Sequence, residues 1–288
     1  MSDITVNRIV IKPTRSVKFD GWEDKFLEYG VSEKLDGVRA IWTGEHFISR
    51  NGKVFQAPSH IIELMKNTCG KAVLDGELHL GRGGFDEVSG VVRQNDNDWD
   101  SVRYSTFDML FDSAGNDITN KNFEDRQKIM IDCVGVFELV GDRSCYTKGG
   151  VFCTVLHQQR YLTASEFEAR MCRIVDGAGG EGLIIRNMSA PYEMKLSKNV
   201  LKYKRSFTDE ATIVGYANGA GKYEGMLGAY LVECGDVSFK VGSGLKDADR
   251  DLSKKLPIGT IITYGYFEKN KTSGVPRFPT FVSVRDYE

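Results

Sequence analysis

Short apolar runs with strand-like spacing alternate with segments of helical spacing along this chain of 288 residues. Such a mixture predicts an α+β fold rather than an all-helical one. In the first two thirds of the chain, we expect strands at residues 39–43, 71–75, 104–111 and 182–186. Helical spacing predicts helices at residues 58–66, 122–133 and 163–175.

Local signals support two of these helices. Pro58 suits the first turn of a helix, where its missing N–H would have no partner within the helix. Thr163 followed by Glu166 matches a capping box, and the glycines at 177–180 are expected to end that helix.

The texture of the chain changes after Lys204. Strand-like runs follow at residues 211–216, 228–233, 237–241, 260–267 and 280–285, with a possible helix at 245–255. Five short strands and one helix are typical of a small OB-fold β-barrel. We therefore predict a first domain over residues 1–207 and an OB-fold domain over residues 208–288.

Charge and targeting signals restrict the possible partners and location. The formal net charge is −2, so a nucleic-acid partner would have to bind a local basic face. Residues 1–20 contain no apolar run typical of a secretory signal, and no stretch approaches the ~18 apolar residues of a membrane span. These observations predict a soluble cytoplasmic protein that does not contact membranes.

The six cysteines are scattered without a CxxC pair, which argues against a zinc site. Disulfides are not expected in a chain without an export signal. We interpret the cysteines as buried thiols.

Lys34 is the first candidate for chemistry, within Glu33-Lys34-Leu35-Asp36-Gly37-Val38-Arg39. A lysine amine with a pKa of about 10.4 is a nucleophile at neutral pH only if burial or neighbouring cations lower that pKa. Gly37 would let the backbone approach a ligand closely, and Arg39 could hold a phosphate through its planar fork. The alternative interpretation is a surface turn, because Asp-Gly is a common turn pair.

Four further clusters could serve the same site. Asp75-Gly76-Glu77 ends a predicted strand, and Glu181 precedes another; either could instead be a turn or a solvated strand end. Lys202 and Lys204 are two residues apart and so would share one face of a strand, although lysines also protect strand edges. Phe107 could stack on a base or lie in the core.

The order of these clusters resembles that of the covalent nucleotidyltransferase superfamily, and most closely that of the ATP-dependent DNA ligases. The resemblance runs from about Ser32 to Arg285. It rests on segments 33–39 (the KxDGxR nucleophile motif), 49–52, 75–77, 104–110, 181–186 and 201–204. It implies an adenylyltransferase domain, with antiparallel sheets and flanking helices, followed by the OB-fold barrel.

The resemblance also implies roles for individual residues. Lys34, Lys202 and Lys204 would be catalytic, with Lys34 carrying AMP and the other two lysines on the α-phosphate. Residues implied to contact ATP are Ser32, Glu33, Arg39, Glu77, Phe107, Glu181 and Arg285. Glu181 and Glu77 would bind Mg²⁺, or Mn²⁺ in its place. The implied reaction transfers AMP from Lys34 to the 5′-phosphate of a nick, which the neighbouring 3′-hydroxyl then seals.

The last motif departs from the family pattern. Ligases commonly end their barrel with an arginine followed two residues later by Asp-Lys, whereas this chain reads Val284-Arg285-Asp286-Tyr287-Glu288. Arg285 is retained and the lysine is missing. Arg285, with Arg277 or Lys271, would therefore have to orient the pyrophosphate; the alternative is a strand end with one exposed arginine.

DNA would have to be held by the two domains alone, since Lys34 lies so near the start of the sequence. We therefore expect a minimal, monomeric ligase that binds nicked double-stranded DNA. The candidate DNA contacts are Arg50, Arg82, Arg93 and Arg205. The glycine-rich segment around Arg82 could equally be an ordinary mobile loop.

Other functions remain open at this point. An mRNA guanylyltransferase shares the lysine motif and the barrel, but Glu181 and Arg186 favour a ligase. An RNA ligase usually lacks this barrel. A nucleic-acid binding module with a decayed active site is the non-enzymatic alternative, and the intact Lys34, Lys202 and Lys204 argue against it.

Overall fold

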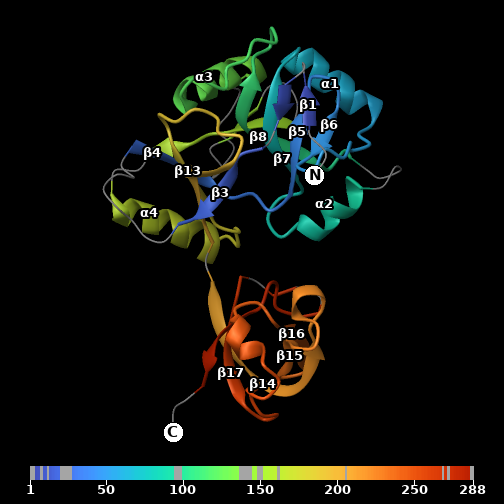
Figure 1. Cartoon of the computed structure of the whole chain (residues 1–288). Coiled ribbons are helices and arrows are strands. Elements are labelled where there is room, and N and C mark those ends of the chain that lie inside the picture. Colours follow the sequence, from blue (N-terminus) through green and yellow to red (C-terminus); the bar gives the residue numbers. More distant parts are fainter. Residues whose placement is uncertain are drawn as a thin grey trace. The chain divides into compact units, whose positions relative to one another are not determined.

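The computed structural model describes residues 4–6, 9–11, 13–19, 28–93, 99–135, 145–147, 152–160, 163–204, 206–267, 269–270 and 273–285. The chain divides into two compact units, Met1–Tyr203 and Lys204–Glu288 (Figure 1). The predicted boundary, between residues 207 and 208, lies four residues further along the chain than this division.

The first unit contains two large sheets and a ribbon in which β1 (Ile4–Val6) pairs with β2 (Ile9–Ile11). The six-stranded sheet has the order β6 (Phe47–Ser49), β5 (Val38–Trp42), β7 (Val73–His79), β8 (Arg103–Phe111), β10 (Cys153–Leu156), β9 (Cys145–Thr147). The five-stranded sheet has the order β11 (Gln159–Arg160), β4 (Tyr29–Glu33), β12 (Leu183–Asn187), β13 (Leu196–Tyr203), β3 (Arg15–Lys18).

Most neighbouring strands pair antiparallel, as predicted. The exceptions are the parallel pairs β8 with β10 and β3 with β13. Between β8 and β10 the chain passes through helix α3 (Phe123–Val134), a crossover of the length that parallel pairing requires.

Two helices begin at a residue whose side chain caps them, and the cap at Thr163 was predicted. Asn122 accepts a hydrogen bond from the Asp125 N–H at 2.8 Å at the start of α3. Thr163 accepts from the Glu166 N–H at 3.2 Å at the start of α4 (Ala164–Met171), which continues as a π-helical turn over Cys172–Asp176. Helix α1 spans Ser59–Cys69, one turn beyond the predicted end.

Two expectations for the first unit are wrong. The candidate DNA-binding segment 81–93, expected to be flexible backbone, contains helix α2 (Phe85–Val91), whose Val88 is fully buried. The possible turn at Asp75-Gly76 is instead the middle of β7. Gly76 is required there because a Cβ would lie 2.6 Å from the ring of Tyr104, which packs across the strand.

Each large sheet has its own apolar core. Trp42, Phe47 and Tyr104 of the six-stranded sheet pack with residues of α1 and α3, and the rings of Phe47 and Tyr104 meet edge to face at 5.0 Å. Val31 and Leu183 of the five-stranded sheet pack with Phe167 and Met171 of α4; Figure 1 shows this helix beside the sheet. Because each sheet buries one face in this way, the two opposite faces can line a site.

The second unit contains all five predicted strands, in the order β16 (Val237–Val241), β15 (Leu227–Cys234), β14 (Phe207–Asn218), β17 (Ile261–Tyr266), β18 (Thr280–Val284). These strands form an OB-like sheet rather than a closed barrel. One isolated parallel bridge, between Ser243 and Thr280, links the two edges.

The predicted helix at residues 245–255 is wrong. Only Asp247–Arg250 is helical, as one 3₁₀ turn. Arg250 is 6% exposed and donates to the carbonyls of Leu227 and Gly228 at 3.0 and 2.8 Å. Asp251 then accepts from the Ser253 N–H at 2.9 Å, which turns the chain out of helical geometry.

The expectation of buried thiols holds for only part of the described cysteines. Cys69 and Cys153 are buried, Cys133 and Cys234 are half-buried, and Cys172 is exposed; all five are free thiols. The side chain of Cys145 lies outside the described residues.

Within the described part of the chain, no helix combines the length and the apolar character needed to span a membrane.

We expect Gly76→Ala to destabilise the first unit by about 1–3 kcal/mol, because the new methyl group would overlap the Tyr104 ring. Urea unfolding followed by the fluorescence of the buried Trp42 and Trp99 measures this loss. Gly90→Ala in α2 is the matched control: no atom lies within 4 Å of the added Cβ, and a helical alanine should leave stability unchanged or raised by up to about 1 kcal/mol. Equal effects of the two changes would contradict this account of Gly76.

Candidate active site

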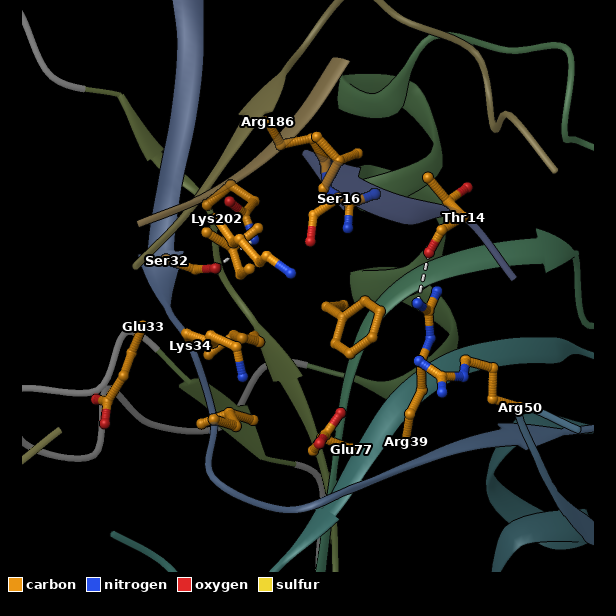
Figure 2. Close-up of a pocket in the computed structure, with 16 residues that line it drawn as sticks. Thr14, Ser16, Ser32, Glu33, Lys34, Arg39, Arg50, Glu77, Arg186 and Lys202 are labelled. Atoms are coloured by element: carbon orange, nitrogen blue, oxygen red, sulfur yellow. Dashed lines mark hydrogen bonds between the residues drawn. The ribbon is translucent and has the colours of Figure 1, made fainter. Parts of the chain in front are cut away.

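A cavity of about 260 Å³ lies between the two sheets of the first unit (Figure 2). Its wall includes strands of both sheets and the segment after β4. The lining residues are Thr14, Ser16, Ser32, Glu33, Lys34, Leu35, Arg39, Arg50, Glu77, Phe107, Leu156, Gln158, Ile184, Arg186, Val200 and Lys202. The sequence motifs that are far apart along the chain therefore meet in one place.

Lys34 follows the last residue of β4, and its side chain enters this cavity (Figure 2). Its backbone N–H donates to the Gly182 carbonyl at 2.9 Å, which ties it to the start of β12. Its Nζ donates to Glu181 Oε2 at 2.5 Å, and the two side chains are 23% and 14% exposed. Gly37 lets this segment cross β7 closely, because a Cβ there would lie 2.3 Å from the Leu78 carbonyl oxygen.

The Glu33 carboxylate, expected to contact ATP, is directed away from the centre of the cavity (Figure 2). Successive side chains of a strand point to opposite faces, so Ser32 faces inward while Glu33 faces outward. Arg82 donates to both carboxylate oxygens of Glu33, at 2.8 and 2.9 Å.

The guanidinium of Arg39, expected to grip a phosphate, is occupied by protein groups. It donates through two nitrogens to the carboxylate of Asp75 and through the third to the Thr14 carbonyl at 2.5 Å. Although burial opposes its charge, Asp75 raises the pKa of Arg39 above its ordinary value. Tyr192 also donates to Asp75, at 2.7 Å.

Phe107 lines the cavity instead of belonging to the main core. Its ring packs with Leu35 and Leu156, and the guanidinium carbons of Arg39 and Arg186 lie 5.4 and 5.8 Å from its centroid. One aromatic face is thus held at the cavity by apolar and cationic neighbours.

Asp108 connects the cavity wall to a buried ion cluster. Its carboxylate accepts from Arg126 at 2.8 and 3.1 Å and from Arg186 at 2.5 Å. Burial alone would raise the pKa of Asp108, but the two arginines hold it below its ordinary value. Burial lowers the pKa of Arg186, although Asp108 opposes that change.

The expected pairing of Lys202 and Lys204 on one strand face is wrong, because β13 ends at Tyr203. Lys202 lies on β13 opposite Ile184 and lines the cavity. Lys204 is the first residue of the second unit, where its Nζ lies 5.3 Å from the ring centroid of Phe267.

The candidate DNA contacts occupy different environments. Arg50 is exposed and lines the cavity, Arg93 is exposed after α2, and Arg82 is paired with Glu33. Arg205, like Lys271, lies outside the described residues.

Arg285 of the second unit, expected to act on the pyrophosphate, pairs with Glu210 of β14. Arg277 lies 6.0 Å from the ring centroid of Phe278.

Several lining residues were not predicted from the sequence. Thr14 and Ser16 belong to the segment entering β3 and to β3 itself, a strand too short to give a clear period. Gln158 is 2% exposed and donates to Ser32 Oγ at 2.8 Å, next to β10. No local signal distinguishes a glutamine of this kind from a surface residue.

The residues present fit a metal that is bound together with a nucleotide. Among the described residues, no group of three or more His, Cys, Asp or Glu side chains could hold an ion alone. Glu77 and Glu181 are close enough for Glu181 to raise the pKa of Glu77. Mg²⁺ commonly takes one or two carboxylates and completes its shell with water and phosphate oxygens.

Comparisons with known proteins agree with this site. The family model of the ATP dependent DNA ligase domain matches residues 22–204, and that of the DNA ligase OB-like domain matches residues 218–285. A Haemophilus influenzae DNA ligase is 29% identical over 252 residues, which cover 87% of this chain and 84% of that protein.

Solved structures give the same result. A Lig E DNA ligase structure, from a study of DNA binding with a minimal scaffold, is 28% identical with a TM-score of 0.80, covering 96% of this chain and all of that chain. The Chlorella virus DNA ligase-adenylate is 23% identical with a TM-score of 0.55, covering 96% and 99% of the two chains, and shares the fold.

Fold and site together define a ligase catalytic domain joined to an OB-like domain. The chain belongs to the ATP-dependent DNA ligase family. Members of this family seal nicks through an adenylate intermediate, and use ATP and a divalent metal.

Glu77 makes stability depend on pH. Burial, reinforced by Glu181 and Asp75 and opposed by Lys34 and Arg39, raises the pKa of Glu77 from 4.5 to about 8. Between these values the folded protein binds more protons than the unfolded chain, so stability falls as pH rises from 4.5 to 8.

Glu77→Gln should remove this loss. We expect the variant to gain stability relative to the parent protein as pH rises through that window. Above pH 8 the gain should be on the order of 2 kcal/mol, since one pKa unit is worth about 1.4 kcal/mol and water in the cavity screens part of the effect. Urea unfolding of nucleotide-free, metal-free protein at several pH values measures the difference. Glu63→Gln on the exposed face of α1 shows the effect of removing an ordinary surface carboxylate. A constant difference between parent and Glu77→Gln across the window would contradict the raised pKa.

Proposed function

We propose that Lys34 is the residue that becomes adenylylated, and that this chain uses the adduct to seal nicks in double-stranded DNA. The observation that carries the proposal is the convergence of Lys34, Lys202 and Glu77 on one cavity, beside the aromatic ring of Phe107, with Glu181 bound to Lys34. Amines, carboxylates and an aromatic ring are the groups needed to hold a nucleotide triphosphate and attack it.

In the first step, Lys34 Nζ attacks the α-phosphorus of ATP. The Nζ–P bond forms as the bond from phosphorus to the bridging oxygen breaks. Pyrophosphate leaves with that electron pair, and the nitrogen releases a proton. Lys202 offsets negative charge on the α-phosphate from across the cavity, and Lys204 is assigned to the same phosphate.

Nucleotide recognition is assigned to the opposite wall. Phe107 stacks on adenine, Ser32 lies on the inward face of β4, and Glu77 contacts the ribose. Arg39 supports this wall through Asp75, and Arg285 is assigned to the pyrophosphate.

We assign the divalent metal as Mg²⁺, held by Glu181 with Glu77. When bound, the metal would offset the negative charge of the phosphates. Without it, the two carboxylates would repel that charge. Binding would also favour the ionised form of Glu77, whose pKa is about 8 without it.

The two later steps use the same lysine. An oxygen of the nick 5′-phosphate attacks the AMP phosphorus, the Nζ–P bond breaks, and Lys34 regains a proton. The 3′-hydroxyl then attacks the 5′-phosphate, AMP leaves, and the hydroxyl proton is released. Arg50 at the cavity, Arg93 and Arg205 hold the DNA phosphates, and one copy of the chain is sufficient.

Lys34→Ala should abolish labelling of the protein by ATP that carries a radioactive α-phosphate, because the amine bound to Glu181 is then missing. Lys34→Arg should also fail, since a guanidinium remains protonated. Lys53→Ala, at an exposed lysine, is the control and should be labelled as the parent is. Labelling of the alanine variant at Lys34 would refute this assignment.

Nucleotide and polynucleotide preference distinguishes the remaining alternatives. Labelling with ATP but not with GTP or NAD supports a ligase over a guanylyltransferase. Sealing of nicked DNA in preference to nicked RNA excludes an RNA ligase. Intact mass spectrometry that finds no adenylate after incubation with ATP would favour the binding module with a decayed site.

A further inference from the structure

Arg82 lies outside the cavity but binds Glu33, the residue that precedes Lys34 in the chain. It follows β7 in the glycine-rich segment 81–84, and its Nε and Nη2 donate to the two oxygens of Glu33 at 2.8 and 2.9 Å. Such paired, parallel hydrogen bonds fix both distance and orientation. Arg82 is not among the residues that line the cavity.

Glu33 needs this partner because it is almost fully buried. It is 4% exposed, whereas Arg82 is 22% exposed. A buried carboxylate without a cation costs several kcal/mol, so the position of Glu33 depends on the guanidinium. Glu33 is bonded through one peptide unit to Lys34, and the position of Lys34 depends on it in turn.

The same guanidinium also reaches the segment that carries Glu181. Its Nη1 donates to the Ala178 carbonyl at 3.3 Å, three residues before Glu181. Lys34 holds the other end of this segment, through its N–H on Gly182 and its Nζ on Glu181. Arg82 therefore ties the backbone before the nucleophile to the backbone before its carboxylate partner.

We propose that Arg82 is a positioning residue for lysine adenylylation, acting through Glu33 and Ala178, and not a contact to DNA. The inference rests on the proposed function of Lys34. A positioning role can be distinguished from a DNA-binding role because adenylylation with ATP takes place before any nick is bound.

The test is single-turnover labelling of Lys34 over a range of ATP concentrations, without DNA. Arg82→Ala should lower the maximal rate by about 10–100-fold, because misplacing reacting groups by on the order of 1 Å costs that much. The ATP concentration for half-maximal rate should stay within about threefold, since Arg82 does not line the cavity and removes no ground-state contact.

Three further variants distinguish positioning from a general loss of structure. Arg82→Lys keeps a cation for Glu33 and should recover part of the rate. Adding Glu33→Gln to Arg82→Ala should also recover part of it, because no unpaired carboxylate is then buried. Arg160→Ala breaks an exposed Arg160–Glu124 pair of the same unit and should leave the rate unchanged.

Binding to nicked DNA at several salt concentrations completes the test. Arg82→Ala should keep the salt dependence of the parent, whereas loss of a phosphate contact would lower the slope of log K against log salt by about 0.9. Parent-like labelling by Arg82→Ala together with a lower slope would overturn the inference and leave the proposed function intact. Absence of labelling in the parent protein would overturn both.

Discussion

Two buried aspartates on adjacent strands are the constraint on which the first unit depends. Asp75 of β7 and Asp108 of β8 are register partners, and both are 0% exposed. Like charges opposite each other in a sheet repel, and burial would add a large desolvation cost. The arrangement is stable only because Arg39 binds Asp75, while Arg126 and Arg186 bind Asp108. Since Arg186 belongs to the five-stranded sheet, its bond to Asp108 fixes one sheet against the other, and with them the width of the cavity.

The same ion pairs hold the aromatic wall of the site. The guanidinium groups of Arg39 and Arg186, each held in place by its aspartate, lie 5.4 and 5.8 Å from the ring centroid of Phe107. The arginines that neutralise the two buried aspartates are therefore the same residues that hold the ring of Phe107 in place. The sequence had suggested that the guanidinium of Arg39 holds a phosphate. In the structure this guanidinium instead donates to the buried carboxylate of Asp75.

Sequence patterns predicted the parts of the fold that depend on local apolar spacing. Residues 104–111 and 237–241 became β8 and β16 almost without change of bounds. The failures are places where distant contacts override local preference. The sequence around Gly76 is compatible with a turn, but the structure shows that glycine is needed in a strand there because the Tyr104 ring fills the space of a side chain. The spacing of residues 245–255 predicts a helix, but Arg250 binds the carbonyls of Leu227 and Gly228 instead. In the site, the motifs identified Lys34 and Lys202, whereas Gln158 and Thr14 become lining residues only when the two sheets face each other.

Three glutamates near Lys34 differ in environment, and the difference sets the charge of the cavity. Glu33 is neutralised by Arg82, and burial raises the pKa of Glu77 to about 8, so that it is mostly protonated at neutral pH. Glu181 is then the carboxylate of the three left to bind Lys34. Lys202 and Arg50 add positive charge to the wall, so the cavity without nucleotide favours an anion. Members of the family use ATP, whose triphosphate is such an anion. Two of the three carboxylates around Lys34 are thus neutralised by the fold itself, one by Arg82 and one by burial.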